Sequence, residues 1–418
     1  MAEPQPLPQE VEVELTDIAN GGQALGRVAG KTVFVPYALP GEVVRVRLVD
    51  DRGRYAFAEG LHLLEASADR VLPRCAHFGP GKCGGCTWQH MAYSAQVALK
   101  TDIVLDQLER VGGFADVPVA VTLACPDAWH NRLSAMLYPL AGGGLGFARV
   151  VPGAALAIEE CHVITPALLA LVDQLDFALE GWQWVELRDN SLGDLMVTLR
   201  LAAEEAPELE IDFKASVNLL LAEDEPVNLV GATHLRYPLR GQSYRVTAGC
   251  FMRHNIAQLE ALLDLVQRWG GLAEGGAVLD LYSGSGLLAS ALAPLANHIT
   301  CVDQHPPAMT DAEENLAAYG HVDLIEGAVE DVLEDLEAGY DLLILDPPAE
   351  GLSLAAVDAL EAVLPRRALL VYEDPAVLAR DAKRLHGRYG YQLQVVQPID
   401  FAPQSYRVTT LAQMERKP

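Results

Sequence analysis

Apolar and polar residues alternate along residues 11–64. The alternating runs are VEVEL, KTVFVPY, EVVRVRLV and YAFAEGLHLL, and Gly-rich or Pro-Gly turns separate them. This alternation predicts strands that bury one face. Several short strands joined by tight turns are typical of a small barrel. We therefore expect an OB-like β-barrel over residues 1–66.

The pattern changes at residue 251. FMRHNIAQLEALLDLVQRW has the apolar spacing of an amphipathic helix. Five strand-like runs follow, each leading into a helical stretch: AVLDLY, HITCVD, VDLIEG, DLLILD and RALLVYE. Strands that alternate with helices predict a parallel, doubly wound sheet. YQLQVVQPID and YRVTTLAQM then close the chain as a hairpin-like pair, so we expect residues 251–418 to form one α/β domain.

The segment between these two regions is mixed. Runs such as DLMVTLRLA are separated by Gly-rich turns, and residues 92–113 have helical spacing. At 418 residues the chain exceeds the usual size of one domain. We expect a multidomain α/β protein with a central α+β domain over residues 67–250.

Charge is distributed unevenly along the chain. The net charge is -27, but residues 1–100 hold 10 basic and 11 acidic side chains, so they contribute only about -1. An acidic chain is a poor general binder of nucleic acid, and the first hundred residues are the surface that would repel a polyanion least. The start of the chain lacks signal-peptide features, and no apolar run is long enough to cross a bilayer. We expect a cytoplasmic monomer without membrane association.

Three of the seven cysteines cluster. Cys75, Cys83 and Cys86 lie on a Gly-rich stretch with the spacing C-x7-C-x2-C, and Cys161 in EECHVIT is a candidate fourth ligand. A chain without a secretion signal is not expected to carry a disulfide framework. Four thiolates suit either zinc or an iron–sulfur cluster, and the spacing leaves both open.

A Gly-rich turn follows the first strand of the α/β region, in the sequence Asp280-Leu281-Tyr282-Ser283-Gly284-Ser285-Gly286. Small residues there let a ligand approach the backbone. The next strand ends 23 residues after Asp280, at Asp303, which is placed to accept ribose hydroxyls. Because no Lys follows the glycines, a P-loop is excluded. The combination favours S-adenosylmethionine over NAD.

The fourth strand of this region ends in Asp346-Pro347-Pro348. Two prolines stiffen the turn and fix the aspartate at the carboxyl edge of the sheet, where α/β proteins bind ligands. We expect Asp346 to line the pocket, facing the donor or the target base.

In order along the chain, these pieces resemble the TRAM-domain uracil-5-methyltransferases that modify tRNA and ribosomal RNA. The segments that carry the resemblance are GGQALGRVAGKTVFVPYALPGEVVRVRL, CGGCTWQHMAYSAQVALK, WHNR, GFAR, LDLYSGSG, LDPPAEGL and DPAVLARD. The resemblance implies an RNA substrate, a TRAM barrel and a class I methyltransferase domain. It also implies S-adenosylmethionine bound near Tyr282, Gly284, Gly286, Asp303, Asp346 and Arg253. It implies a 4Fe–4S cluster rather than zinc, on Cys75, Cys83, Cys86 and Cys161.

The sequence departs from that family where the reaction occurs. In the family a Cys thiolate adds to carbon 6 of uracil, and a carboxylate base later removes the carbon 5 proton. Glu373 occupies the position of the thiol, Thr409 that of the base, Arg253 that of a Gln, and Ala349 that of an Arg. Cys250 is the nearest alternative thiol in the sequence, and a buried structural role is expected for it.

Three hypotheses follow. The first is an RNA methyltransferase whose carbon 5 chemistry is lost or impaired, with a base nitrogen as an alternative target. The second is a non-catalytic homologue that binds RNA and the cofactor. The third, a metabolic methyltransferase, would leave the barrel without a role.

Overall fold

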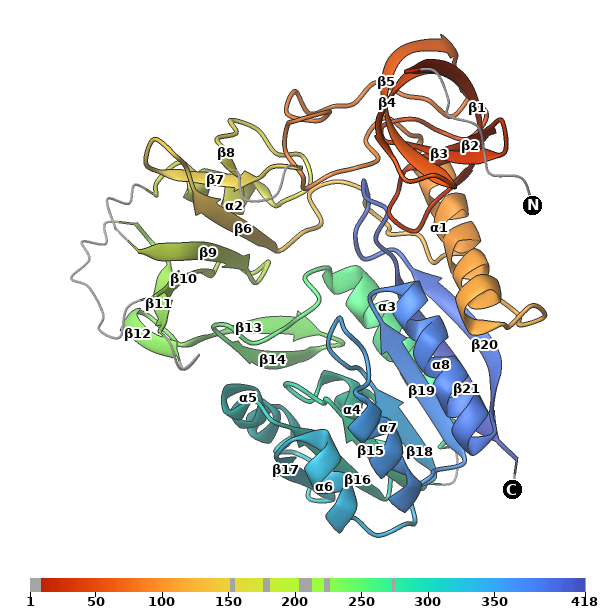
Figure 1. Ribbon diagram of the computed structural model, residues 1–418. Helices are drawn as coiled ribbons and strands as arrows, with labels where there is room; N and C mark the ends of the chain where they lie inside the picture. Colours follow the sequence, from red (N-terminus) through yellow and green to blue (C-terminus); the bar gives the residue numbers. More distant parts are fainter. Residues whose placement is uncertain are drawn as a thin grey trace.

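The computed structural model describes residues 9–150, 155–175, 181–202, 213–221, 226–272 and 275–417. Three bodies of structure are visible in Figure 1: a barrel formed by the N-terminal residues, a central sheet, and a larger C-terminal sheet with helices on its faces. The predicted multidomain α/β architecture is confirmed. No helix within the described ranges is both long and apolar enough to span a membrane.

The N-terminal strands form a closed barrel in the order β1-β2-β3-β5-β4. The strands are β1 (Glu10–Ile18), β2 (Ala24–Val28), β3 (Lys31–Val35), β4 (Val43–Asp51) and β5 (Tyr55–Glu65). Their alternating burial follows the alternating sequence, since inward residues such as Val13, Val33 and Val46 are fully buried. The barrel predicted from the sequence is therefore present.

A long connection leads from the barrel to α1 (Tyr93–Gln107), which continues as a π-helical turn, η1 (Leu108–Gly112). The helix contacts α8 and β20 of the C-terminal domain. Lys100 on α1 is fully buried and donates to Asp400, which is also fully buried, at 2.5 Å. Tyr93 donates to the other oxygen of Asp400. These contacts attach the N-terminal part of the chain to the C-terminal domain.

The central sheet has the order β12-β11-β10-β9-β6-β7-β8 among the described residues. Its strands are β6 (Ser134–Pro139), β7 (Leu145–Ala148), β8 (Ala155–Leu156), β9 (Trp182–Asp189), β10 (Leu195–Leu201), β11 (Ser216–Leu220) and β12 (Pro226–Val230). The short helix α2 (Pro166–Val172) packs on β9. A separate hairpin, β13 (His234–Leu239) and β14 (Gln242–Thr247), leads into the C-terminal domain.

The C-terminal sheet has the order β17-β16-β15-β18-β19-β21-β20. The strands are β15 (Ala277–Leu281), β16 (His298–Asp303), β17 (Val322–Glu326), β18 (Leu342–Leu345), β19 (Arg367–Tyr372), β20 (Tyr391–Ile399) and β21 (Thr409–Arg416). The helical elements are α3 (Ile256–Gly270), α4 (Leu287–Leu292), α5 (Pro306–Leu316), α6 (Val329–Asp335), α7 (Leu354–Ala359), η2 (Leu360–Ala362) and α8 (Pro375–Tyr389). The first five strands are parallel, and β21 is antiparallel to both neighbours.

Two apolar clusters cover the two faces of this sheet. Strand order reverses between β15 and β18, so the carboxyl ends of these strands form the crevice in which doubly wound sheets bind ligands. The fold therefore places the turns after β15, β16, β18 and β19 at one edge.

Candidate functional site

The turn after β15 is strained and open. Tyr282 has φ of 60°, in the left-handed region that a residue with a side chain rarely adopts. Gly284 has φ of 53°, and a Cβ there would meet nothing within 4 Å, so the backbone is open to a ligand on that side. Gly286 has φ of 76°, and a Cβ there would lie 2.7 Å from Leu316. The second glycine therefore lets the start of α4 pack against α5.

Asp303, at the end of β16, holds this turn in place. Its Oδ2 accepts from the Gly284 amide at 2.8 Å, and its Oδ1 accepts from the His305 amide at 2.9 Å. Each carboxylate oxygen keeps a second lone pair, so Asp303 can still accept hydroxyl hydrogens. The structure thus brings Asp303 to the Gly-rich turn, as the sequence predicted.

Asp280, inside β15, is fully buried. Burial, followed by the nearby carboxylate of Asp346, raises its pKa well above the ordinary value, and the Ala289 amide offsets part of that rise. Neither carboxylate oxygen, nor the buried hydroxyl of Ser283, has a hydrogen-bond partner of good geometry among the described residues. Buried polar groups without partners are rare. The carboxyl groups of Asp280, Asp303 and Asp346 are neighbours at one edge, where a polar ligand can supply hydrogen-bond partners.

A second group of side chains forms the corner where β18, β19 and β21 meet. Arg253 donates from Nη1 and Nη2 to the two oxygens of Asp346, both at 2.7 Å, and from Nε to Glu373 at 2.7 Å. The Thr409 hydroxyl donates to the other Glu373 oxygen at 3.0 Å. Asp374 is instead the N-cap of α8, accepting from the Ala376 amide at 2.7 Å. Four side chains therefore make one continuous network.

Burial and charge act in opposite directions in this network. Burial alone would lower the pKa of Arg253, but the carboxylates of Asp346 and Glu373 raise it. Burial raises the pKa of Asp346, and the Arg253 guanidinium offsets part of that rise. The Arg253 side chain is 7% exposed, and that of Glu373 is 45% exposed. The guanidinium is thus a buried cation held by two carboxylates, a bidentate arrangement that is geometrically specific.

A cavity of about 660 Å³ opens beside this network and is large enough for a small-molecule-sized group. Phe251, Arg253, Glu373 and Thr409 are among the residues that line it. The four cysteines that the sequence singled out, Cys75, Cys83, Cys86 and Cys161, line the same cavity. Asp346 is not among the lining residues, so Arg253 connects the cavity to the cofactor edge.

The four cysteines come from two separate segments. The Cys83 amide donates to the His77 carbonyl, and the Gly85 amide donates to Cys83 Sγ at 3.4 Å. Burial, with smaller contributions from Cys161, Glu160 and Cys86, raises the pKa of Cys75 to about 11. Within the described ranges, no set of three His, Cys, Asp or Glu side chains is close enough to hold a single metal ion. The thiols therefore share one cavity without forming a compact single-ion site.

Three arginines line the same cavity without a carboxylate partner. Arg149 and Arg407 form no ion pair with any residue in the described ranges. Among the residues that the structure describes, Arg132 donates only to backbone carbonyls, those of Gly85 and Pro403. In a chain of net charge -27, unpaired cations around one cavity mark it as a site for an anion.

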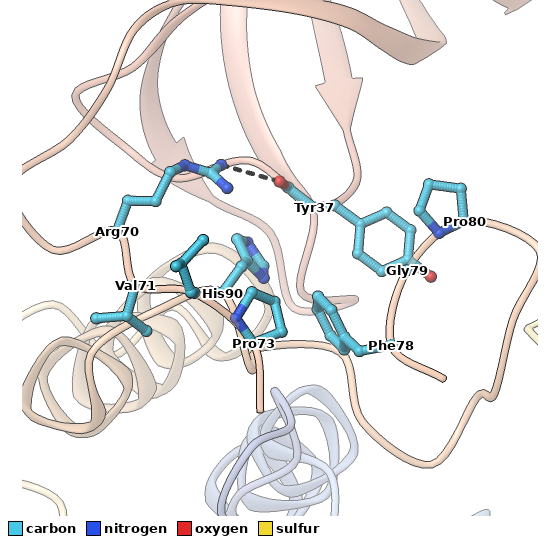
Figure 2. A pocket seen from close by; sticks show the side chains of 9 residues that line it. Tyr37, Arg70, Val71, Pro73, Phe78, Gly79, Pro80 and His90 are labelled. Atoms are coloured by element: carbon cyan, nitrogen blue, oxygen red, sulfur yellow. Dashed lines mark hydrogen bonds between the residues drawn. The ribbon is translucent and has the colours of Figure 1, made fainter. Parts of the chain in front are cut away.

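A smaller cavity of about 260 Å³ lies where the barrel meets the cysteine loop (Figure 2). Tyr37, Phe78 and His90 form its aromatic walls, with Phe78 and His90 stacked at 5.6 Å between ring centroids. Arg70 donates to the Tyr37 carbonyl at 3.0 Å and binds the buried carboxylate of Glu42. Phe78 lines both cavities, so this junction connects the barrel to the larger cavity.

The alternative thiol suggested by the sequence is not available. Cys250 is 1% exposed, and burial raises its pKa. It does not line the cavity that Glu373 lines. The sequence did not predict that Arg253 pairs with the carboxylates of Asp346 and Glu373. Nor did it predict that the buried Asp280 carboxyl has no hydrogen-bond partner of good geometry among the described residues. The unusual Arg in FMRHN was the one available signal for that pairing.

Comparisons with known proteins agree with this geometry. The TRAM domain family matches residues 8–61, and the methyltransferase small domain family matches residues 248–365. An uncharacterized RNA methyltransferase of Streptomyces avermitilis is 31% identical, over 97% of this chain and 98% of that protein. Another uncharacterized RNA methyltransferase, from Thermosynechococcus vestitus, is 30% identical over 96% of this chain and 97% of that protein.

A solved structure shares the fold over nearly all of this chain. It is a Pyrococcus abyssi tRNA (uracil-54, C5)-methyltransferase in complex with S-adenosyl-L-homocysteine. It matches with a TM-score of 0.73 and 21% identity, and covers 97% of this chain and 100% of that one. With a barrel, a doubly wound sheet and relatives that match over nearly their whole length, the chain belongs to the family of TRAM-domain RNA methyltransferases.

Proposed function

We propose that this protein binds RNA in the 660 Å³ cavity and S-adenosylmethionine at the edge formed by the turns after β15 and β16, and that it has lost, or severely impaired, methyl transfer to carbon 5 of uracil. The Arg253–Asp346–Glu373–Thr409 network is the observation that carries this proposal.

The network stands where the family has its reactive side chains, and the side chains that form it are hydrogen-bonded to one another. Addition to carbon 6 of a pyrimidine requires a soft, strong nucleophile, and a carboxylate is neither. Both oxygens of Glu373 accept hydrogen bonds, one of them from a cation, which lowers their nucleophilicity further. Thr409 has no accessible protonation equilibrium near neutral pH, so it cannot act as the base that removes the carbon 5 proton.

The cofactor edge is suited to S-adenosylmethionine. Asp303 has free lone pairs for the ribose hydroxyls, and Gly284 leaves the backbone open beside it. Among the described residues, the buried Asp280 carboxyl and the Ser283 hydroxyl have no hydrogen-bond partner of good geometry, which fits a polar ligand. When bound, S-adenosylmethionine supplies an electrophilic methyl group. The residues of this chain would orient that group toward Arg253 and the cavity.

An RNA substrate is supported by charge and shape. Unpaired Arg149 and Arg407 suit phosphate groups, and exposed Phe251 offers a ring against which a base can stack. Relatives named as RNA methyltransferases, and the TRAM domain, support the same substrate class.

We also propose an iron–sulfur cluster on Cys75, Cys83, Cys86 and Cys161. The four cysteines line one cavity, and four thiolates are the usual ligand set of a 4Fe–4S cluster. Anaerobic purification should give a brown, iron-containing protein, and Cys161→Ser should lose iron whereas Cys301→Ser, a substitution elsewhere in the chain, should not. A colourless, zinc-containing protein would contradict the cluster.

The non-catalytic alternative gains support from the position of Arg253. Its guanidinium connects the cavity to the cofactor edge, where a methyl group would have to pass. Methylation of a base nitrogen is less well supported, because the Asp346 carboxylate is already paired bidentately with the Arg253 cation, which weakens it as an acceptor for a target amine.

The deciding experiment compares RNA nucleosides, by mass spectrometry, from cells with and without the gene. We expect no loss of 5-methyluridine, and a missing methylated base of another kind would identify an altered reaction. Loss of 5-methyluridine in the deletion strain, restored by the purified protein with labelled S-adenosylmethionine, would refute the proposal.

A matched gain-of-function test uses the same corner. The triple variant Arg253→Gln, Glu373→Cys and Thr409→Glu rebuilds three of the four replaced family residues and leaves Ala349, and Glu373→Cys alone restores only the thiol. Appearance of carbon 5 methylation in the triple variant would show that the remainder of the site is competent.

A further inference from the structure

The loop between β20 and β21, residues 400–408, leads from a buried ion pair to the 660 Å³ cavity. Asp400, at its start, binds Lys100 of α1, and both side chains are fully buried. Arg407, near its end, lines the cavity. Thr409, which follows the loop, begins β21 and belongs to the network at the corner of β18, β19 and β21. The position of this loop therefore affects the cavity and the corner together.

The side chain of Gln96, on α1, holds the middle of this loop. It is fully buried, and its Oε1 accepts from the Gln404 amide at 2.9 Å. Its Nε2 donates to the side-chain oxygen of Gln404 at 3.1 Å. The same nitrogen lies within hydrogen-bond distance of the Trp88 and Met91 carbonyls, at 3.1 and 3.0 Å. One side-chain amide therefore joins α1, the segment after Cys86 and the β20–β21 loop.

Gln404 has a backbone conformation that needs this support. Its φ is 68°, in the left-handed region that a residue with a side chain rarely adopts. Its carbonyl accepts from the Thr87 and Trp88 amides at 3.0 and 2.9 Å, and the residue is buried. Such strain persists only where the surrounding contacts fix the backbone, and it is concentrated at functional sites. The contacts of Gln96 and of the segment after Cys86 provide that fixation.

The backbone of Arg407 is fixed on both sides. The Tyr406 amide donates to the Thr87 hydroxyl at 3.2 Å, and Val408 is buried. The Arg407 side chain is nevertheless exposed and lines the cavity. Gln96 itself lines neither of the two cavities described above. It can therefore affect a ligand in the larger cavity only through the residues that it holds.

We propose that Gln96 is a positioning residue for RNA binding: it fixes the β20–β21 loop so that the Arg407 guanidinium is presented to a phosphate group in the cavity. A cation whose backbone is already fixed loses less conformational freedom on binding, which favours affinity. The inference rests on the proposed binding of RNA in the cavity, and it adds how one of the cations there is positioned. The contacts of Gln96 described above do not reach the turns after β15 and β16. We therefore expect the affinity for S-adenosylmethionine not to depend on Gln96.

The test is a double-mutant cycle on the full-length protein, with a fluorescein-labelled tRNA as the probe. We expect Gln96→Met and Arg407→Ala each to weaken binding about 10-fold, and the double variant to bind little worse than either, because both changes remove the same contact. The matched control pairs Gln96→Met with Arg149→Ala, since Arg149 directly follows β7 and lines the cavity from outside the loop. There the two losses should multiply to about 100-fold. A similar 100-fold loss in the cycle with Arg407 would overturn the proposal.

A milder variant covers the case in which loss of the buried Gln96 amide prevents folding. Asn is tolerated in the left-handed region, so Gln404→Asn keeps the loop conformation, while its shorter side chain loses the contact with Gln96. We expect tRNA binding to weaken about 3-fold, with an unchanged affinity for S-adenosylmethionine in calorimetry. A parallel loss of cofactor affinity in either variant would indicate general damage to the fold and overturn a positioning role.

Hydrogen exchange distinguishes this proposal from the proposed function, because it needs no RNA. Gln96→Met should speed exchange of the Gln404 amide, which loses its acceptor, and of the neighbouring Tyr406 amide. Unchanged exchange at both amides would overturn the positioning role even if the protein binds RNA. A wild-type protein that binds no tRNA would refute the proposed RNA function, and faster exchange in Gln96→Met would then still show that Gln96 fixes the loop.

Discussion

Two neighbouring corners of the C-terminal sheet have different characters. The corner after β15 and β16 keeps the features of a binding site: an open Gly-rich turn, an aspartate with free lone pairs, and buried polar atoms without partners. The corner at β18, β19 and β21 has every charged group bonded to another group of the same chain. The first corner has free acceptors for a ligand, whereas the polar groups of the second are already hydrogen-bonded within the chain. Cofactor binding can therefore be kept in this fold while catalysis is lost.

The largest expected effect comes from removing the Arg253 guanidinium at the corner of β18, β19 and β21. Arg253→Met would leave the largely buried carboxylate of Asp346 without its cation. Removing one partner of a buried ion pair costs about 3–5 kcal/mol, and urea unfolding should show a loss of that order. Arg47→Met is the control, because it breaks an exposed, solvent-screened pair and should leave the urea unfolding midpoint nearly unchanged. A loss below about 1 kcal/mol for Arg253→Met would show that the network does not stabilise the fold.

The second largest effect concerns the corner after β15 and β16. Asp303→Ala removes both the proposed ribose contact and the acceptor that orders Gly284. We expect the affinity for S-adenosylmethionine, measured by calorimetry, to fall about 100-fold, which corresponds to about 2.7 kcal/mol. Asp303→Asn keeps one acceptor oxygen and should lose less. An unchanged affinity in Asp303→Ala would contradict the assignment of this edge to the cofactor.

The sequence predicted these two corners unequally well. Strand and turn patterns located the barrel, the doubly wound sheet and the Gly-rich turn, because periodicity and turn chemistry are local properties. The sequence alone shows that Glu373 and Thr409 stand where the family has its nucleophile and its base. It does not show which side chains these two residues contact. Only the fold shows that residues 253, 346, 373 and 409 meet, since these contacts depend on strand order. The domain boundaries, the cluster and the cofactor residues stay predictions.

A smaller effect should come from Asp280. Because burial raises its folded pKa above 3.8, the folded chain holds the proton where the unfolded chain releases it. The contribution of Asp280 therefore makes stability fall as the pH rises above about 4. Asp280→Asn should remove this dependence and stabilise the ligand-free protein at neutral pH, which urea unfolding can measure. The variant should also bind S-adenosylmethionine more weakly. Asp323→Asn, a change at a mostly exposed carboxylate, should alter neither property.

The smallest effect should come from Glu373→Gln, which removes one charge from the corner of β18, β19 and β21 and keeps its shape. The Glu373 side chain is 45% exposed, so its pair with Arg253 is screened by solvent and should contribute less than about 1 kcal/mol to stability. Because the Glu373 carboxylate helps to raise the pKa of Asp346, the substitution should lower that pKa, which NMR titration of the Asp346 carboxyl group can measure. If Glu373→Gln instead abolished a methyl transfer that wild type performs, with stability unchanged, Glu373 would be a reactive group. The contrast between a corner with free acceptors and a corner whose polar groups are already hydrogen-bonded would then fail.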